Sequence, residues 1–173
     1  MDKDELYQKM LAKVIVFLAY KPRTRKEISL RLDRYLKSQK ALTADTKTEV
    51  VDSIFDYLAQ NKLIDDEEFI RLFVESKTRG KSVLGKRVIQ NKLIAKGISK
   101  ENAAAFVDGE ISEEDELISA TNALIGKFKS VDFHDFAKNV SRETHDKMGR
   151  FLLSRGFSYS TAKQAVDYLL KRP

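Results

Sequence analysis

The feature that most constrains the fold of this 173-residue chain is an internal repeat. Residues 89–99, IQNKLIAKGIS, align with residues 148–158, MGRFLLSRGFS, and every apolar position that would face a core is matched. In both copies an apolar stripe with helical spacing is followed by a cation, a glycine, an apolar residue and a serine. This order predicts a helix that ends in a left-handed glycine cap and a serine that begins the next helix. The repeat therefore predicts helical units placed in series.

A weaker third copy occurs earlier, with residues 26–32 as its middle helix. Apolar stripes with helical spacing recur along the chain, as at Val50, Ile54 and Leu58, and no sustained apolar/polar alternation predicts a strand. A single three-helix unit buries little surface, so we expect the units to pack end to end. The predicted fold is all-α, an elongated array of three tandem three-helix repeats. The predicted units are residues 1–64, 65–111 and 112–173.

Helix boundaries are marked by familiar end signals. Pro22 predicts that the first helix ends near Tyr20, because proline disfavours the helical conformation of the residue before it. The acidic runs 65–68 and 113–116 each precede an apolar stripe and fit the first turn of a helix. Gly97 and Gly156 are the predicted left-handed caps, followed by the serine N-caps, Ser99 and Ser158.

Composition narrows the class of protein. Apolar residues make up 42% of the chain, enough for a core, and charged residues 34%, which with 7 Gly and 2 Pro favours long solvated helices. The absence of Cys excludes disulfides, thiolate metal sites and thiol nucleophiles. No apolar run approaches the ~20 residues that span a bilayer, and the N-terminal residues are too polar for a signal peptide. We therefore expect a soluble, cytoplasmic protein that has no membrane partner.

The net charge of +6 is unevenly distributed. Residues 77–100 contain eight basic residues and no acid, and residues 21–40 contain eight basic residues and two acids. The cations gather on the middle helix of each unit and on the segment before it, so stacked units would present a basic strip to an anionic partner. The alternative is that lysine and arginine simply solvate exposed helix faces. The predicted contact residues are Arg23, Arg25, Lys26, Arg31, Lys77, Arg79, Lys86, Arg87, Lys92, Arg150 and Arg155.

Catalysis is not predicted. His134 and His145 are the only histidines and have no metal-ligand spacing, and consecutive carboxylates on a helix point in different directions. No phosphate-binding glycine loop and no nucleophile motif is found, so we expect no catalytic residue, no metal and no cofactor. Few aromatic residues interleave with the cations, so the sequence predicts no stacking platform for single strands.

The residues resemble those of a known family, the RecX regulatory proteins of bacteria. The run LIDDEEFI at 63–70 followed by FVESK at 73–77, the run RTRKEI at 23–28, and RFLLSRGFSY at 150–159 look like segments of that family. The similarity covers most of the chain, from about residue 14 to residue 170. Two departures are local: Lys86 stands where the family often has proline, and Asn61 where glycine is commoner, although asparagine also tolerates a left-handed cap.

The resemblance implies a fold of three tandem three-helix repeats and a role in modulating RecA, the recombinase that coats single-stranded DNA. Proteins of this family lie along the groove of the RecA filament and restrain its extension, strand exchange, ATP hydrolysis and co-protease activity in the SOS response. The implied partners are the RecA–DNA filament and, in addition, DNA itself, with the protein acting as a monomer. We expect the basic strip, including an exposed Lys86 and Arg87, to face the filament. Two other hypotheses are a helix-turn-helix regulator that reads a specific DNA sequence and a scaffold for an acidic protein.

Overall fold

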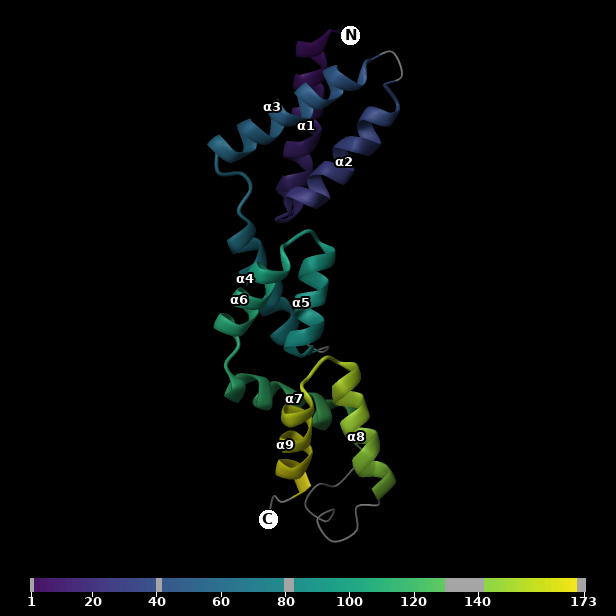
Figure 1. The fold of residues 1–173 in the computed structure, drawn as a ribbon, viewed down its shortest axis with the longest axis vertical. Helices are drawn as coiled ribbons and strands as arrows, with labels where there is room; N and C mark the ends of the chain where they lie inside the picture. The colour runs from purple at the N-terminus through teal and green to yellow at the C-terminus, as the bar shows by residue number, and fades with distance from the viewer. Residues whose placement is uncertain (1, 40–41, 80–82, 130–141, 171–173) are drawn as a thin grey trace. The chain divides into compact units, whose positions relative to one another are not determined.

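The computed structural model describes residues 2–39, 42–79, 83–129 and 142–170 (Figure 1). These residues form nine α-helices and contain no strand, which confirms the all-α prediction. The chain divides into two compact units: residues 1–69 with the Lys96–Ile98 turn, and residues 70–95 with 99–173. The helices are α1 (Lys3–Tyr20), α2 (Arg25–Lys37), α3 (Ala44–Gln60), α4 (Asp66–Thr78), α5 (Lys86–Ala95), α6 (Lys100–Glu110), α7 (Glu113–Lys127), α8 (Arg142–Ser154) and α9 (Tyr159–Leu170).

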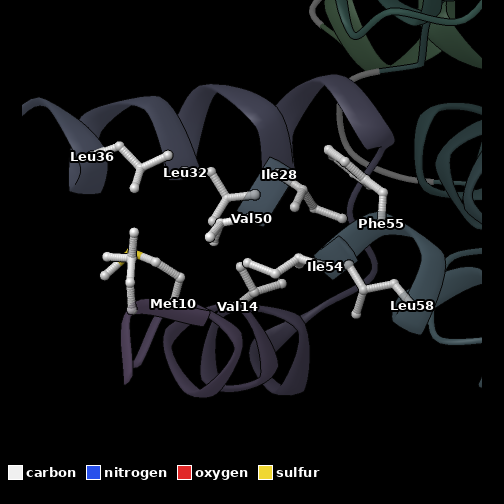
Figure 2. Packing of buried hydrophobic residues seen from close by; sticks show 10 residues of the cluster. Met10, Val14, Ile28, Leu32, Leu36, Val50, Ile54, Phe55 and Leu58 are labelled. Carbon is white, nitrogen blue, oxygen red and sulfur yellow. The ribbon is translucent and has the colours of Figure 1, made fainter. Parts of the chain in front are cut away.

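The core of the first unit lies between α1, α2 and α3 (Figure 2). Each of these helices places apolar residues three or four positions apart, so that they form one stripe along the helix. Burying one such side chain contributes roughly 1.5–3 kcal/mol. The buried residues are Leu6, Met10 and Val14 of α1, Ile28, Leu32 and Leu36 of α2, and Val50, Ile54, Phe55 and Leu58 of α3.

The predicted end of α1 is confirmed. The residue with a left-handed backbone after α3 lies one position beyond Asn61. Helix α1 ends at Tyr20, two residues before Pro22, as predicted. The residue with a left-handed backbone after α3 is Lys62 (φ 51°), not Asn61 (φ −91°). The Asn61 side chain donates a hydrogen bond to the Tyr57 carbonyl at 2.8 Å, which keeps it on the last helical turn, so the chain reverses one residue later.

In the second unit, α5 packs against α6, and α7, α8 and α9 surround a separate core. Helix α5 buries Ile89 and Leu93, and α6 buries Ala103 and Val107, the positions that the repeat aligns with the later copy. The α7–α9 core consists of Ala120, Leu124, Met148, Leu152, Phe157, Ala162, Ala165, Val166 and Leu169.

Both predicted glycine caps have left-handed backbones, φ 97° at Gly97 and φ 91° at Gly156. The predicted serine caps are also confirmed: Ser99 and Ser158 accept hydrogen bonds at 3.1 and 3.0 Å from N–H groups in the first turns of α6 and α9. A side chain at Gly156 is excluded by space as well, because an added Cβ would lie 2.5 Å from the Val88 side chain.

Each glycine turn packs against the start of an earlier middle helix. In the second unit, the Gly85 N–H donates to the Arg155 carbonyl at 2.9 Å and the Arg87 N–H donates to the Gly156 carbonyl at 3.3 Å. In the first unit, the Thr24 hydroxyl donates to the Lys96 carbonyl at 2.7 Å. An added Cβ on Gly97 would lie 2.5 Å from the Lys26 Cβ. A glycine turn therefore packs against the start of a middle helix twice, through backbone hydrogen bonds at Gly156 and through the Thr24 and Lys26 side chains at Gly97.

We expect Gly156→Ala to lower the free energy of unfolding by about 2 kcal/mol or more. The left-handed backbone alone costs an L-residue roughly 1–2 kcal/mol, and the new methyl group also displaces Val88. Urea unfolding followed by circular dichroism measures this loss. The control is Gly149→Ala in α8, where an added Cβ meets no atom within 4 Å. The control should be neutral or stabilising by up to about 1 kcal/mol, because alanine is the better helix former. Equal stability of the two variants would contradict the role of the Gly156 turn.

Candidate interface for an anionic partner

The eleven predicted contact cations lie on the middle helices α2, α5 and α8 or close to helix ends. The structure shows that most of them already contact other parts of the protein. Most of these contacts are of three kinds: stacking on aromatic rings, pairing with carboxylates and hydrogen bonding to backbone carbonyls. They decide which cations are available to a partner.

Aromatic rings hold the cations between α1 and α2. The Arg23 guanidinium lies 4.1 Å from the centre of the Phe17 ring, and that of Arg31 lies 5.2 Å from the same ring. Arg31 also donates from Nε to the Tyr35 hydroxyl at 2.7 Å, and Lys13 lies 4.5 Å from the Tyr35 ring. Such contacts contribute about 0.5–1 kcal/mol each at exposed sites. They orient the charges before any partner binds.

Sequence reasoning missed Phe17 and Lys13 in this cluster. The two residues are four positions apart on α1, which places them on one helix face, but nothing in the local pattern shows that α2 packs its arginines there. The expectation that few aromatic residues accompany the cations is therefore wrong at this end of the chain. The rings that the structure describes here are covered by cations of the protein itself.

The turn after α5 brings a lysine of the acid-free stretch to a carboxylate. Lys96 Nζ lies 2.6 Å from Glu27 Oε1, with the two side chains 28% and 22% exposed. Glu27 also completes the capping box of α2 with Thr24. Burial opposes ionisation of Glu27, but the Lys96 hydrogen bond, the Thr24 N–H and the charges of Lys96 and Arg23 together lower its pKa below 4.5.

Arg25 and Lys26 also take part in intramolecular contacts within the first unit. The Arg25 guanidinium lies 4.0 Å from the centre of the Phe55 ring, and its backbone hydrogen-bonds to the Asp66 carboxylate. Burial of Asp66 and the neighbouring charge of Asp65 raise the pKa of Asp66, against the opposing effect of Arg25. The Lys26 side chain lies against Gly97.

Lys86 corrects a prediction. We expected it on an exposed face, but its side chain is only 19% exposed and Nζ lies 3.4 Å from Asp108 Oδ1. Its backbone N–H donates at 3.1 Å to Glu116, an acid that is 7% exposed and also accepts from the Thr161 hydroxyl at 3.3 Å. Glu116 therefore caps α5 as well as standing in the first turn of α7, where the sequence placed it. The pairing was missed because 22 residues separate Lys86 from Asp108 in the chain.

The remaining cations differ in the contacts that they make within the protein. Arg87 is exposed as expected, although its guanidinium donates to the Leu153 carbonyl at 2.9 Å. Arg79 pairs with Glu75 at 2.6 Å, and Lys77 and Arg155 lie over Phe73 and Phe151. The side chains of Lys92 and Arg150 are exposed, and no hydrogen bond, ion pair or ring contact joins either of them to the residues described.

The part of the chain that the structure describes contains neither a cluster of metal ligands nor a membrane-spanning helix. No three His, Asp or Glu side chains there lie close enough together to hold a metal ion. None of the described helices is both long and apolar enough to cross a membrane. His145 lies 3.8 Å from Asp146 and 3.9 Å from Asp167, and His134 lies outside the described residues.

Known proteins resemble this chain over most of its length. A family model described as the second three-helix domain of RecX matches residues 65–106. A protein of Chlorobium limicola named regulatory protein RecX is 33% identical over 147 residues, covering 84% of this chain and 86% of the relative. The RecX of Finegoldia magna is 34% identical over 148 residues, covering 86% of this chain and 65% of the relative.

The chain spans a smaller part of other relatives: it covers 54% of the Listeria welshimeri RecX, with 30% identity over 162 residues. Among solved structures, the crystal structure of RecX from Lactobacillus salivarius aligns with a TM-score of 0.70 at 23% identity, covering 94% of this chain and 96% of that one. A second crystal structure of regulatory protein RecX gives a TM-score of 0.71 at 22% identity. Both likenesses support the all-helical fold.

The Glu27–Lys96 pair makes a prediction about pH. Because the pKa of Glu27 is lower in the folded than in the unfolded protein, ionised Glu27 stabilises the fold at neutral pH, and this stabilisation is lost as the pH falls through the folded pKa, below 4.5. We therefore expect Glu27→Gln to cost about 1 kcal/mol at pH 7 and less as the pH is lowered toward 3. Urea unfolding at a series of pH values measures the difference. Glu110→Gln, at an exposed position, should change stability by less than about 0.5 kcal/mol. A Glu27→Gln cost that is independent of pH would contradict the role of the ionised pair.

Proposed function

The chain belongs to the RecX family of regulatory proteins, and from that premise we propose that it regulates the RecA recombinase without catalysis of its own. In this proposal it binds along the groove of the RecA filament on single-stranded DNA. It restrains filament extension, ATP hydrolysis and strand exchange. It acts as a monomer in the cytoplasm, and it makes direct contacts to DNA phosphates in addition to protein contacts.

The observation that carries the proposal is the recurrence of cations on successive middle helices of a repeated fold. A partner that repeats along its own length can bind each unit in a similar way. Linked weak contacts then act at high effective concentration, so that several surface charges together give useful affinity. A ligand that prefers one conformation of a filament shifts the filament toward that conformation, which is how a protein without an active site can slow ATP hydrolysis.

ATP turnover by RecA on single-stranded DNA tests the proposal most directly. We expect substoichiometric amounts of this protein to lower the turnover rate and to shorten the filaments seen by electron microscopy. Unchanged turnover together with unchanged filament length would contradict an inhibitory role. Binding to a single DNA operator far more tightly than to random DNA would favour the helix-turn-helix hypothesis instead.

The interface is tested most directly at the cations that have no described partner. We expect Lys92→Glu with Arg150→Glu to weaken binding to the RecA filament about tenfold, since each reversal removes an attraction and adds a repulsion. Fluorescence anisotropy of the labelled protein against increasing RecA filament measures this affinity.

The matched control reverses two exposed lysines that were not predicted to be in the interface, Lys9→Glu with Lys127→Glu. It keeps the net charge of the test variant, so a loss caused only by net charge appears in both proteins. Equal weakening in the two variants would show that position does not matter and would remove Lys92 and Arg150 from the interface. Circular dichroism should show unchanged helicity in both.

A further inference from the structure

A shallow groove of about 670 Å³ runs between α2 and α3 in the first unit, outside the cation–aromatic cluster of α1 and α2. We propose that this groove binds an acidic, amphipathic helix of a partner protein. The inference goes beyond the proposed function, because it does not require that the partner be RecA. The groove is lined by Leu30, Asp33, Arg34, Leu36, Lys37, Lys47, Thr48 and Val51.

The floor of the groove is apolar. Leu30 of α2 is 48% exposed, and it lies outside the core stripe that α2 buries through Ile28, Leu32 and Leu36. Half-buried Val51 of α3 and buried Leu36 of α2 also line the groove. Covering this floor with leucine-like side chains would remove it from water, which favours binding.

The rim carries charges that the protein leaves unpaired. The side chains of Arg34, Lys37 and Lys47 form no ion pair, hydrogen bond or ring contact with the residues described, in contrast to those of Arg23, Arg25 and Arg31 on the neighbouring part of the molecule. Asp33 is the one acid in the lining, so the groove has an excess of two positive charges. Carboxylates of a partner would complement this rim.

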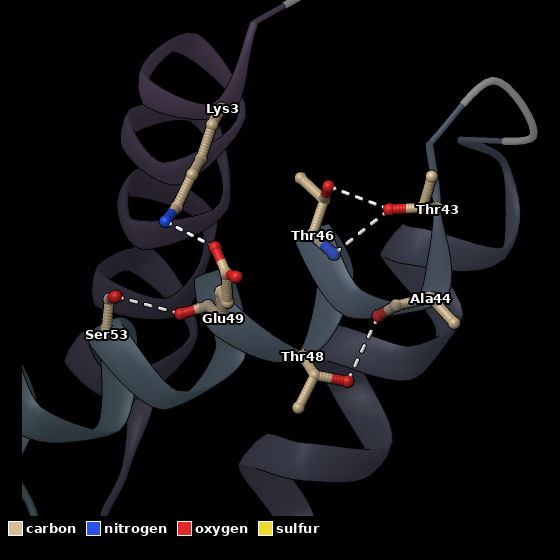
Figure 3. A network of polar contacts seen from close by, with 7 residues as sticks. All are labelled: Lys3, Thr43, Ala44, Thr46, Thr48, Glu49 and Ser53. Atoms are coloured by element: carbon tan, nitrogen blue, oxygen red, sulfur yellow. Dashed lines mark hydrogen bonds and ion pairs between the residues drawn. The ribbon is translucent and has the colours of Figure 1, made fainter.

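The lining residues of the groove all lie on the regular backbone of α2 and α3. Thr43 caps α3 by accepting a hydrogen bond from the Thr46 N–H at 3.2 Å, and Thr48 donates to the Ala44 carbonyl at 3.1 Å (Figure 3). Lys3 and Glu49, 2.5 Å apart, join α1 to the same part of α3. The backbone that carries Lys47 is therefore held by a well-capped helix.

A peptide helix fits these features better than nucleic acid does. Single-stranded nucleic acid is bound on aromatic rings that stack with the bases, and no aromatic side chain lines this groove. A helix that lies in a groove instead uses apolar residues at positions i, i+3 or i+4 and i+7, with charges on either side. The volume also falls within the roughly 300–1,000 Å³ of ordinary ligand pockets.

The test uses a fluorescein-labelled synthetic helix with leucines at i, i+3, i+4 and i+7 flanked by glutamates, titrated with the full chain. We expect saturable binding in the micromolar range that weakens at least tenfold in Arg34→Glu with Lys37→Glu. The matched control is Lys9→Glu with Lys21→Glu, which has the same net charge and exposed positions elsewhere in the same unit. The control should bind as tightly as the unaltered protein, and unaltered binding by the Arg34/Lys37 variant would overturn the proposal.

Changes in the synthetic peptide test the groove without any substitution in the protein, so the result does not depend on how the protein variants fold. Replacing the leucines of the peptide by serine, or its glutamates by glutamine, should each lower affinity at least tenfold. If the serine peptide binds as well as the leucine peptide, charge alone is responsible and the groove is not the site. If an oligo-dT strand displaces the peptide and binds the same variants in the same order, the site is one for nucleic acid and the proposal is wrong. Because no RecA is present, failure here leaves the proposed regulation of RecA untouched.

Discussion

The packing of each glycine turn against the start of an earlier middle helix is the constraint on which the rest of the structure depends. At Gly97 and Gly156 the backbone is left-handed and the space for a Cβ is already taken by Lys26 and Val88. Backbone groups therefore approach closely enough to bond directly, as the Gly85 N–H does to the Arg155 carbonyl. The contact at Gly156 uses backbone hydrogen bonds and the contact at Gly97 uses the Thr24 hydroxyl, so the two copies make similar packing with different groups.

This arrangement also explains why so many basic residues are engaged within the protein. The turn after α5 places Lys96 on Glu27, and the turn after α8 places the Leu153 carbonyl within reach of Arg87. Glu116, buried nearby, accepts the Lys86 N–H at the start of α5. Part of the charge bias in the sequence is thus a requirement of the fold. The cations that remain for a partner form a smaller set than the sequence alone suggests.

Whether a feature could be predicted from the sequence depends on how far apart its interacting residues lie in the chain. The end of α1, the serine caps and the left-handed glycines are local, and each was predicted from a few neighbouring residues. The exposure of Lys86 was predicted wrongly because its partner Asp108 is on another helix. Lys62 rather than Asn61 has the left-handed backbone because the Asn61 side chain bonds back to its own helix, a choice between two local geometries that composition does not decide. The division into three units stays a prediction, since the boundaries depend on packing between helices.

Cations that are held by contacts within the protein and cations that have no described partner differ in what they contribute to binding. An arginine held over a ring, as Arg23 is over Phe17, has already lost side-chain freedom, so a phosphate or carboxylate that reaches it has less entropy to overcome. A cation with no described partner, such as Arg150, must be ordered on binding, so each of its contacts contributes little to the free energy of binding. Many weak contacts of the second kind dissociate one at a time, and an affinity built from them would depend on salt and be readily reversed.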